Sequence, residues 1–183
     1  MIRALILFSL IISIVTAKET IDERWGISVL FPETEDWTAV TKSEYSPKTQ
    51  GWGARKKDGS IALSLMATND DLPEKQQTFE SDSKIWEQKT SHLITSVLSR
   101  RITSFKGHSA CEIVALTVRE GRTIYSSHWM IQGQGGYYYF ITIVAADKNE
   151  LQSSIAVSFL ESIEVSKQEV PNGSQRPATS AHG

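Results

Sequence analysis

Four histidines and one cysteine are the residues from which a metal site or a nucleophilic site could be built in this chain. The histidines are His92, His108, His128 and His182. Their spacing fits no pattern of metal ligands, and no phosphate-binding, dinucleotide-binding or zinc-protease motif occurs. We therefore expect neither a metal nor a cofactor. Cys111 falls within a predicted strand, where a cysteine acts more often as a small buried hydrophobic residue than as a nucleophile.

His128 and Glu112 are the candidates for acid–base chemistry. A neutral imidazole buried or half-buried in the core is the commoner role for a histidine on such a strand, and a ligand or general base is the alternative. Ser127 and His128 cannot form a dyad, because successive strand residues point to opposite faces. Glu112 is an acid on an otherwise apolar face. It could be a catalytic carboxyl in a pocket, or it could lie near a helix margin and reach water or Arg122, which we favour.

Three aromatic residues, Trp37, Trp52 and Tyr137, are candidate contacts for a ligand or a partner. Each falls in a loop or at the start of a predicted strand, where an amphipathic ring can contact another molecule. Packing at the rim of the core is the alternative role for these rings, and it is the commoner one.

Residues 108–147 form the stretch that must position most of these side chains. Runs of β-branched and aromatic residues are interrupted at 120–121 and at 133–136, which predicts three antiparallel strands joined by two tight turns. Both faces of these strands are apolar, and such strands must be covered on both sides. A slip of one residue would exchange the two faces and leave that conclusion intact.

The two turns also predict which residues face each other across the strands. A two-residue turn at 120–121 places Glu112 opposite Trp129. A loop at 133–136 then places Trp129 opposite Phe140 and Met130 opposite Tyr139.

The remaining elements are predicted from periodicity and from turn residues. Strands are expected at about 25–31, 38–42, 52–57, 60–68 and 162–165, and helices at about 74–91 and from Asp147, which would form a capping box with Glu150. Residues 94–104 keep a helical spacing, but most of them are poor helix formers; we predict a strand there, with a helix as the alternative. The fold class is therefore α+β. We expect a single domain with a central, mostly antiparallel sheet of about six to eight strands, covered by helices on both faces.

The two ends of the chain differ in composition from the middle. Residues 1–17 have a short basic start, an apolar run and small or branched residues before Ala17, which predicts a signal peptide that is cleaved near Ala17. The apolar run is too short to span a bilayer, so we expect no stable membrane span after cleavage. Residues 18–166 form the predicted domain. Residues 167–183 are rich in polar residues, proline and glycine, and are expected to be a disordered tail.

The charge is slightly acidic, with 19 Lys and Arg against 21 Asp and Glu. Because these charges are scattered, they give no electrostatic footprint for nucleic acid. A single cysteine excludes an internal disulfide, despite the predicted export.

Three short segments carry a resemblance to a known group: residues 27–32 followed by Trp37, the segment 107–110 that enters the three-strand stretch, and Ser158-Phe159 with Ile163. They resemble the PsbP-like fold group, which includes the extrinsic photosystem II subunit, DcrB-like bacterial envelope proteins and Mog-type Ran-binding proteins. The resemblance covers about residues 25–165. It implies an accessory or binding protein without a shared catalytic centre, and fold alone does not transfer function.

From these observations we expect an exported, periplasmic or secreted, non-enzymatic accessory or binding protein. Its partner would be an envelope or secreted protein or a small ligand, and not a nucleic acid. The alternative is a small envelope enzyme, a hydrolase that uses Glu112 or His128 in a pocket between sheet and helix.

Overall fold

The computed structural model describes residues 17–22, 24–69 and 78–166. Its strands are β1 Ala17–Asp22, β2 Ile27–Pro32, β3 Thr41–Ser46, β4 Thr49–Arg55, β5 Ile61–Thr68, β6 Ser96–Phe105, β7 His108–Arg119, β8 Arg122–Gln132, β9 Tyr138–Ala145 and β10 Glu164–Val165. Its helices are α1 Phe79–Thr90 and α2 Ser154–Ser162, with short 3-10 helices η1 Ser91–Leu93, η2 Gln134–Gly136 and η3 Lys148–Gln152.

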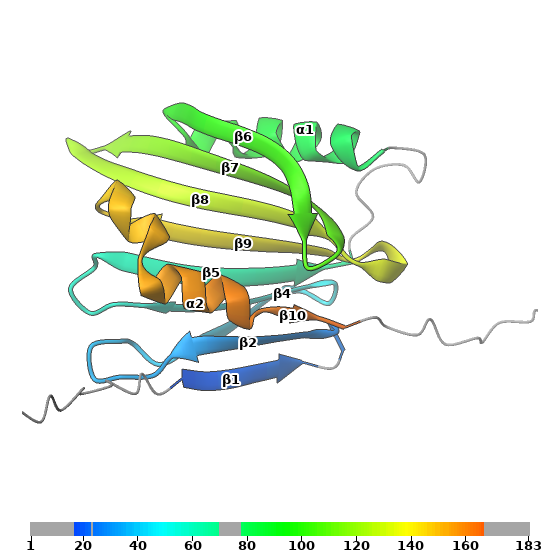
Figure 1. Cartoon of the computed structure of the whole chain (residues 1–183), viewed down its shortest axis with the longest axis horizontal. Coiled ribbons are helices and arrows are strands. Elements are labelled where there is room, and N and C mark those ends of the chain that lie inside the picture. Colours follow the sequence, from blue (N-terminus) through cyan, green and yellow to red (C-terminus); the bar gives the residue numbers. More distant parts are fainter. Residues whose placement is uncertain (1–16, 23, 70–77, 167–183) are drawn as a thin grey trace, which may run out of the picture.

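Seven strands form one sheet in the order β3-β4-β5-β9-β8-β7-β6, and every neighbouring pair is antiparallel. The predicted single α+β domain with a mostly antiparallel sheet is therefore confirmed. A second sheet, in the order β1-β2-β10, was not predicted as a separate layer. Figure 1 shows it beside α2, below the large sheet in that view.

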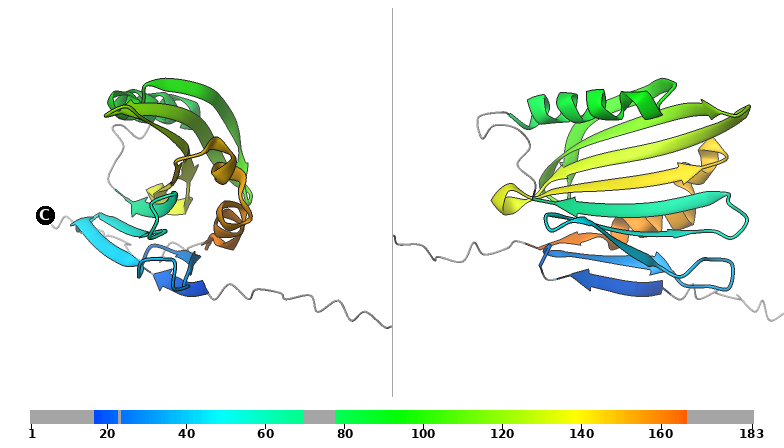
Figure 2. Two further views of the ribbon diagram at one scale, coloured as in Figure 1. Left: turned by 90° about the vertical axis from the view of Figure 1, so that its left-hand side faces the viewer. Right: turned by 180° about the vertical axis from the view of Figure 1, so that it is seen from behind.

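The central strands contribute to two apolar clusters, because their consecutive side chains point to opposite faces. Ile131 belongs to the larger cluster, which also contains Phe159 of α2 and residues of β2. Met130 belongs to the smaller cluster, against which Phe79 and Trp86 of α1 pack. The prediction that both faces of residues 108–147 are apolar is confirmed. Figure 2 shows the curved sheet with the two helices beside it.

The pairing of β7 with β8 is as predicted, with Glu112 opposite Trp129. The predicted pairing of β8 with β9 was wrong by one residue, since Trp129 faces Ile141 and Met130 faces Phe140. The cause is Tyr137, which belongs to the loop: its carbonyl accepts a hydrogen bond of 2.8 Å from the Gly133 N–H. The slip exchanges the faces of β9 but keeps both of them apolar.

Several predicted strand boundaries were also wrong. The first predicted strand was expected from Trp25, but β2 begins at Ile27, because Trp25 lies in a turn with Gly26 at a φ of 58°. The strand predicted at 38–42 is β3, which begins at Thr41. The hairpin predicted at 58–59 is confirmed between β4 and β5. Residues 96–105 form strand β6, so the strand prediction there is confirmed and the helical alternative is wrong.

The helix boundaries show two further differences. Thr78 caps α1, and its side chain accepts a hydrogen bond from the Ser81 N–H; the predicted start at residues 74–77 lies outside the described residues. The helix expected from Asp147 is divided in two. Asp147 caps the 3-10 helix η3, and Ser153 begins α2 with a cap of its own, because its hydroxyl accepts from the Ala156 N–H.

The predicted signal peptide and tail cannot be compared with the structure, because residues 1–16 and 167–183 lie outside its described part. Among the described helices, none is both long and apolar enough to cross a bilayer.

Candidate binding site

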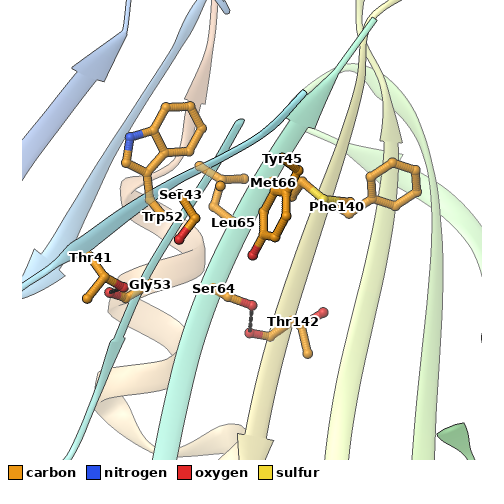
Figure 3. Close-up of a pocket in the computed structure, with 11 residues that line it drawn as sticks. Thr41, Ser43, Tyr45, Trp52, Gly53, Ser64, Leu65, Met66, Phe140 and Thr142 are labelled. Carbon is orange, nitrogen blue, oxygen red and sulfur yellow. Dashed lines mark hydrogen bonds between the residues drawn. The ribbon is translucent and has the colours of Figure 1, made fainter. Parts of the chain in front are cut away.

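A shallow depression of about 240 Å³ lies over strands β3, β4, β5 and β9, at the β3 edge of the large sheet. Figure 3 shows the side chains around it. Its lining consists of Thr41, Ser43, Tyr45, Gly51, Trp52, Gly53, Ser64, Leu65, Met66, Phe140 and Thr142. These residues are neutral, and they combine hydroxyl groups with aromatic and apolar side chains. The depression can therefore take a ligand that is polar without being charged.

Two glycines of β4 make the depression possible. Gly51 faces Met66 of β5, and Gly53 faces Ser64. A Cβ at Gly51 would lie 2.8 Å from Cε2 of Tyr45, so any side chain there would displace the tyrosine ring. A Cβ at Gly53 would lie 3.3 Å from the Leu63 carbonyl oxygen. Gly51 thus makes room for the Tyr45 ring, and the Gly53 backbone remains partly exposed in the floor of the depression.

Tyr45 is a large, exposed aromatic side chain at this edge. It extends from β3, at a register irregularity between Glu44 and Ser46, and 69% of its surface is accessible. One side of the ring rests over Gly51, and the rest remains open to solvent. An aromatic ring held in place by backbone on one side offers a preformed apolar surface to a ligand.

Hydroxyl side chains line the same depression as that ring. The Thr41 hydroxyl donates to the Gly53 carbonyl at 3.2 Å, and the Ser64 hydroxyl donates to the Thr142 carbonyl at 3.4 Å, as drawn in Figure 3. A hydroxyl that donates one bond keeps lone pairs for accepting another. The lining can therefore accept hydrogen bonds from a ligand without breaking the bonds that hold its own side chains.

His128 lies on the same face of the sheet as the depression, next to Thr142. Its Nδ1 is 3.2 Å from the Thr142 hydroxyl, and its Nε2 is 2.9 Å from the Ser126 hydroxyl. Burial lowers the pKa of His128 below its ordinary value of 6.5, which favours the neutral ring. The predicted half-buried imidazole is confirmed, although the residue of β9 that faces His128 is Thr142 and not Ile141. Ser127 is on the other face, as expected from strand geometry.

The buried state of His128 predicts a pH-dependent stability. The unfolded chain regains the ordinary pKa, so it binds a proton more readily than the folded chain once the pH falls below about 6.5. The free energy of unfolding should therefore fall as the pH drops below that value, and be unaffected by this group above it. Urea unfolding of the wild type and of His128→Gln, measured on both sides of pH 6.5, would show a smaller pH dependence in the variant.

The control for this experiment is His92→Gln, because His92 is exposed. It should keep the wild-type pH dependence. An equal loss of pH dependence in both variants would contradict the assignment to His128.

Glu112 lies on the opposite face of the sheet from His128 and the depression. Its carboxylate forms an ion pair with Arg101 and accepts a hydrogen bond of 3.3 Å from the Ser127 hydroxyl. Glu112 therefore contacts Arg101 of the neighbouring strand β6, and not Arg122 as expected. The Trp129 indole N–H donates to the Ser127 hydroxyl at 3.1 Å. Each carboxylate oxygen is thus engaged by a side chain of the protein.

Glu112 also borders a hollow of about 310 Å³ beside η3, together with Ser127 and Lys148. This hollow lies between the sheet and the 3-10 helix η3. Glu112 and His128 cannot act in it together. Ile113 follows Glu112 in β7 and pairs with His128, so the side chains of Ile113 and His128 lie on the opposite face of the sheet from Glu112.

The three aromatic residues proposed from the sequence occupy different environments. Trp37 and Trp52 are buried in the larger core cluster, with 6% and 4% of their surface exposed. Trp52 nevertheless lines the depression, while its ring belongs to the core. Tyr137 is half-buried in the β8–β9 loop, where its ring meets that of Trp25 edge-on at 5.9 Å. Of these three aromatic residues, only Trp52 therefore lines the depression. Tyr45 also lines it and was not proposed from the sequence.

Within the described residues, no group of three or more His, Cys, Asp or Glu side chains is arranged to hold a metal ion. Cys111 is buried, and burial raises the pKa of its thiol.

No protein-family model matches this chain. No curated protein matches it either.

Three of the solved structures to which this chain is similar share 10–12% identity with it. One is a protein from Bacteroides thetaiotaomicron, with a TM-score of 0.49 over 78% of this chain, which spans 46% of the length of that protein. Another is PA94, a protein of unknown function from Pseudomonas aeruginosa, with a TM-score of 0.43 over 86% of this chain and 99% of the other. The third is LpqN of Mycobacterium tuberculosis, involved in cell envelope biogenesis, with a TM-score of 0.47 over 82% of this chain and 91% of the other.

Proposed function

We propose that this chain is an exported, non-enzymatic binding protein that holds an uncharged polyhydroxylated ligand, such as a sugar, in the β3–β4–β5–β9 depression. The observation that carries the proposal is the exposed Tyr45 ring, which rests on the Gly51 backbone among hydroxyl groups and without a charged neighbour in the lining. Export is supported by the composition of residues 1–17.

A sugar matches this lining in two ways. Its ring carries an apolar face of C–H groups that can lie against the Tyr45 ring, while its hydroxyl groups can bond the hydroxyls of Ser43 and Ser64. A charged ligand would lose hydration on binding and find no opposite charge in the lining. The depression is shallow, so we expect weak to moderate affinity.

Binding can be tested by calorimetric titration with a panel of neutral oligosaccharides, with uronic-acid oligosaccharides as charged comparisons. We expect at least one neutral member to bind, with an affinity reduced about tenfold or more by Tyr45→Ala, because the variant removes the stacking surface. Ser64→Ala should weaken binding to a smaller extent.

The matched control is Thr123→Ala, which removes an exposed hydroxyl of β8 that does not line the depression. It should bind like the wild type. The proposal fails if no neutral oligosaccharide binds, if the charged ones bind better, or if Tyr45→Ala leaves the affinity unchanged.

The fold assignment belongs to the same proposal. We propose a PsbP-like domain in which α1 and α2 cover opposite faces of the sheet, supported by the segments quoted above and by the separate clusters in which the two helices pack. Cleavage near Ala17 would be checked by mass spectrometry of the exported protein, whose mature chain should begin near Lys18.

The alternative of a hydrolase rests on the hollow beside η3. Glu112 is already bound by Arg101 and Ser127 there, so a role as general base would require one of these contacts to break. We therefore favour the binding protein.

A further inference from the structure

A second hollow, of about 430 Å³, lies over one end of strands β5, β8 and β9. It is on the same face of the sheet as the depression, because Ala62 and Val144 in its lining stand two positions from Ser64 and Thr142 on β5 and β9. The two linings share no residue. The β4–β5 and β7–β8 turns lie at this end of the sheet, on the left in Figure 1.

The floor of the hollow is apolar. Ala62 faces Val144 across β5 and β9, and Ile124 of β8 lies beside them in the lining. All three side chains are half-buried, so part of their apolar surface is open to solvent. A concave apolar surface of this volume, with a few polar groups at its border, is the usual form of a site for a small molecule.

Two arginines stand at one border of the hollow. Arg122 lines it, and Arg119 faces Arg122 directly across the β7–β8 turn, so both side chains leave the sheet on the same face. Glu120 and Gly121 form the turn between them, and residues that close such a two-residue turn have Cα atoms about 5.5 Å apart. Like charges directly opposite each other destabilise a pair of strands. A bound anion between the two arginines would remove this repulsion.

No carboxylate of the protein takes that place. Among the described residues, neither Arg119 nor Arg122 forms an ion pair, and both side chains are exposed. Asp58 of the β4–β5 turn is paired with Lys56 at 3.1 Å. Its carboxylate also accepts a hydrogen bond of 2.8 Å from the Ser60 N–H.

A third arginine adds to the positive charge of this face. Arg55 of β4 faces Ala62, so its side chain leaves the sheet on the side of the hollow. It is exposed and, in the part of the chain that the structure describes, has no carboxylate partner. An apolar hollow bordered by arginines of one sign attracts anions and repels cations.

We propose that this hollow binds an amphipathic anion, a carboxylate or phosphate head group on a short apolar body. The head group would bond the guanidinium groups of Arg119 and Arg122, whose planar fork of donors matches both kinds of oxyanion. The apolar body would cover Ala62, Ile124 and Val144 and displace water from them. The site is separate from the sugar-binding depression, and either could exist without the other.

Calorimetric titration of the full chain with octanoate and octyl phosphate tests this site. We expect at least one of them to bind, and the tighter one identifies the head group. Acetate and inorganic phosphate should bind about tenfold or more weakly, because they lack the apolar body. Octan-1-ol, which has the body without the charge, should also bind more weakly, and added salt should weaken the binding of the anions.

Arginine variants assign the head group. The double variant Arg119→Gln, Arg122→Gln should lower the affinity about tenfold or more, because it removes both charged donors. Arg55→Gln should have a smaller effect, since β4 lies three strand spacings, or about 14 Å, from β8. Lys89→Gln is the control, as Lys89 is an exposed cation of α1 outside the lining. It should bind like the wild type, and so should Tyr45→Ala, which alters only the depression.

The proposal is overturned if neither octanoate nor octyl phosphate binds, or if octan-1-ol or the bare anions bind equally well. It is also overturned if the double variant keeps the wild-type affinity, or if Lys89→Gln lowers it as much. Circular dichroism of the double variant should match the wild type, because both arginines are exposed. The ligand comparisons and the salt dependence test the proposal on the wild type without any variant.

Discussion

Replacing Ile141 by alanine is expected to lower the free energy of unfolding by about 3 kcal/mol or more, the usual cost of a large-to-small change in a core. Ile141 has no exposed surface and lies on β9, the strand between β5 and β8. It faces Leu65 on one side and Trp129 on the other. The cavity left by alanine cannot close easily, because strands hold both sides in register.

Urea unfolding would measure this effect, with Ile102→Ala as the control of the same residue type. Because Ile102 is exposed, its replacement should change the free energy of unfolding by less than about 0.5 kcal/mol. An unfolding midpoint that Ile141→Ala leaves unchanged would show that β9 is not the central strand of the core.

Tyr138→Phe is expected to cost about 2 kcal/mol through the loss of one hydrogen bond. The Tyr138 hydroxyl donates to Oδ2 of Asp82 in the first turn of α1 at 2.6 Å, and both residues are buried. Burial, together with this bond to Asp82, raises the pKa of the Tyr138 hydroxyl, so it remains protonated and continues to donate. Removing it leaves a buried carboxylate oxygen without that donor.

A double-mutant cycle with Asp82→Ala would isolate this interaction. We expect the Tyr138→Phe change to cost much less when Asp82 is already alanine, because no acceptor is then left unsatisfied. Equal costs in the two backgrounds, measured by urea unfolding, would contradict a direct stabilising bond between β9 and α1.

The sequence was most informative where local chemistry determines geometry. The Glu120-Gly121 turn fixed the pairing of β7 with β8, since a two-residue loop permits a single register and both residues have positive φ. The β8–β9 register was missed because four consecutive loop residues do not reveal where the strand resumes. A hydrogen bond between Gly133 and Tyr137 decides that, and it exists only in the folded loop.

The helix after β9 shows the same limit. Asp147 and Glu150 form the expected pattern of a helix start, and Asp147 does cap a helix, but only the short η3. Ser153 begins a new helix because its own side chain satisfies the first turn of α2. Two capping residues, Asp147 and Ser153, were thus present in the sequence, and the extended backbone of Ser153 separates the two helices.

Of the residues that line the candidate site, the sequence analysis proposed only Trp52, because the lining combines the consecutive strands β3, β4 and β5 with β9, which is distant in sequence. A signal was nevertheless present at alternate positions: Thr41, Ser43 and Tyr45, then Gly51 and Gly53. This period of two marks one face of a hairpin that lacks large aliphatic residues. The tryptophans were proposed instead because each falls in a loop or at a strand start, yet a large ring at such a position is often part of the core, as Trp37 and Trp52 are.

The exposed position of β3 has an evolutionary consequence. Tyr45, Thr41 and Ser43 extend from an edge strand whose other side chains are largely exposed, so changes at these positions create no internal cavity. Gly51, in contrast, is constrained, because any side chain there would meet the Tyr45 ring. The chain can therefore exchange one ligand preference for another by mutation of a single strand, while the selection that maintains folding acts on separate residues.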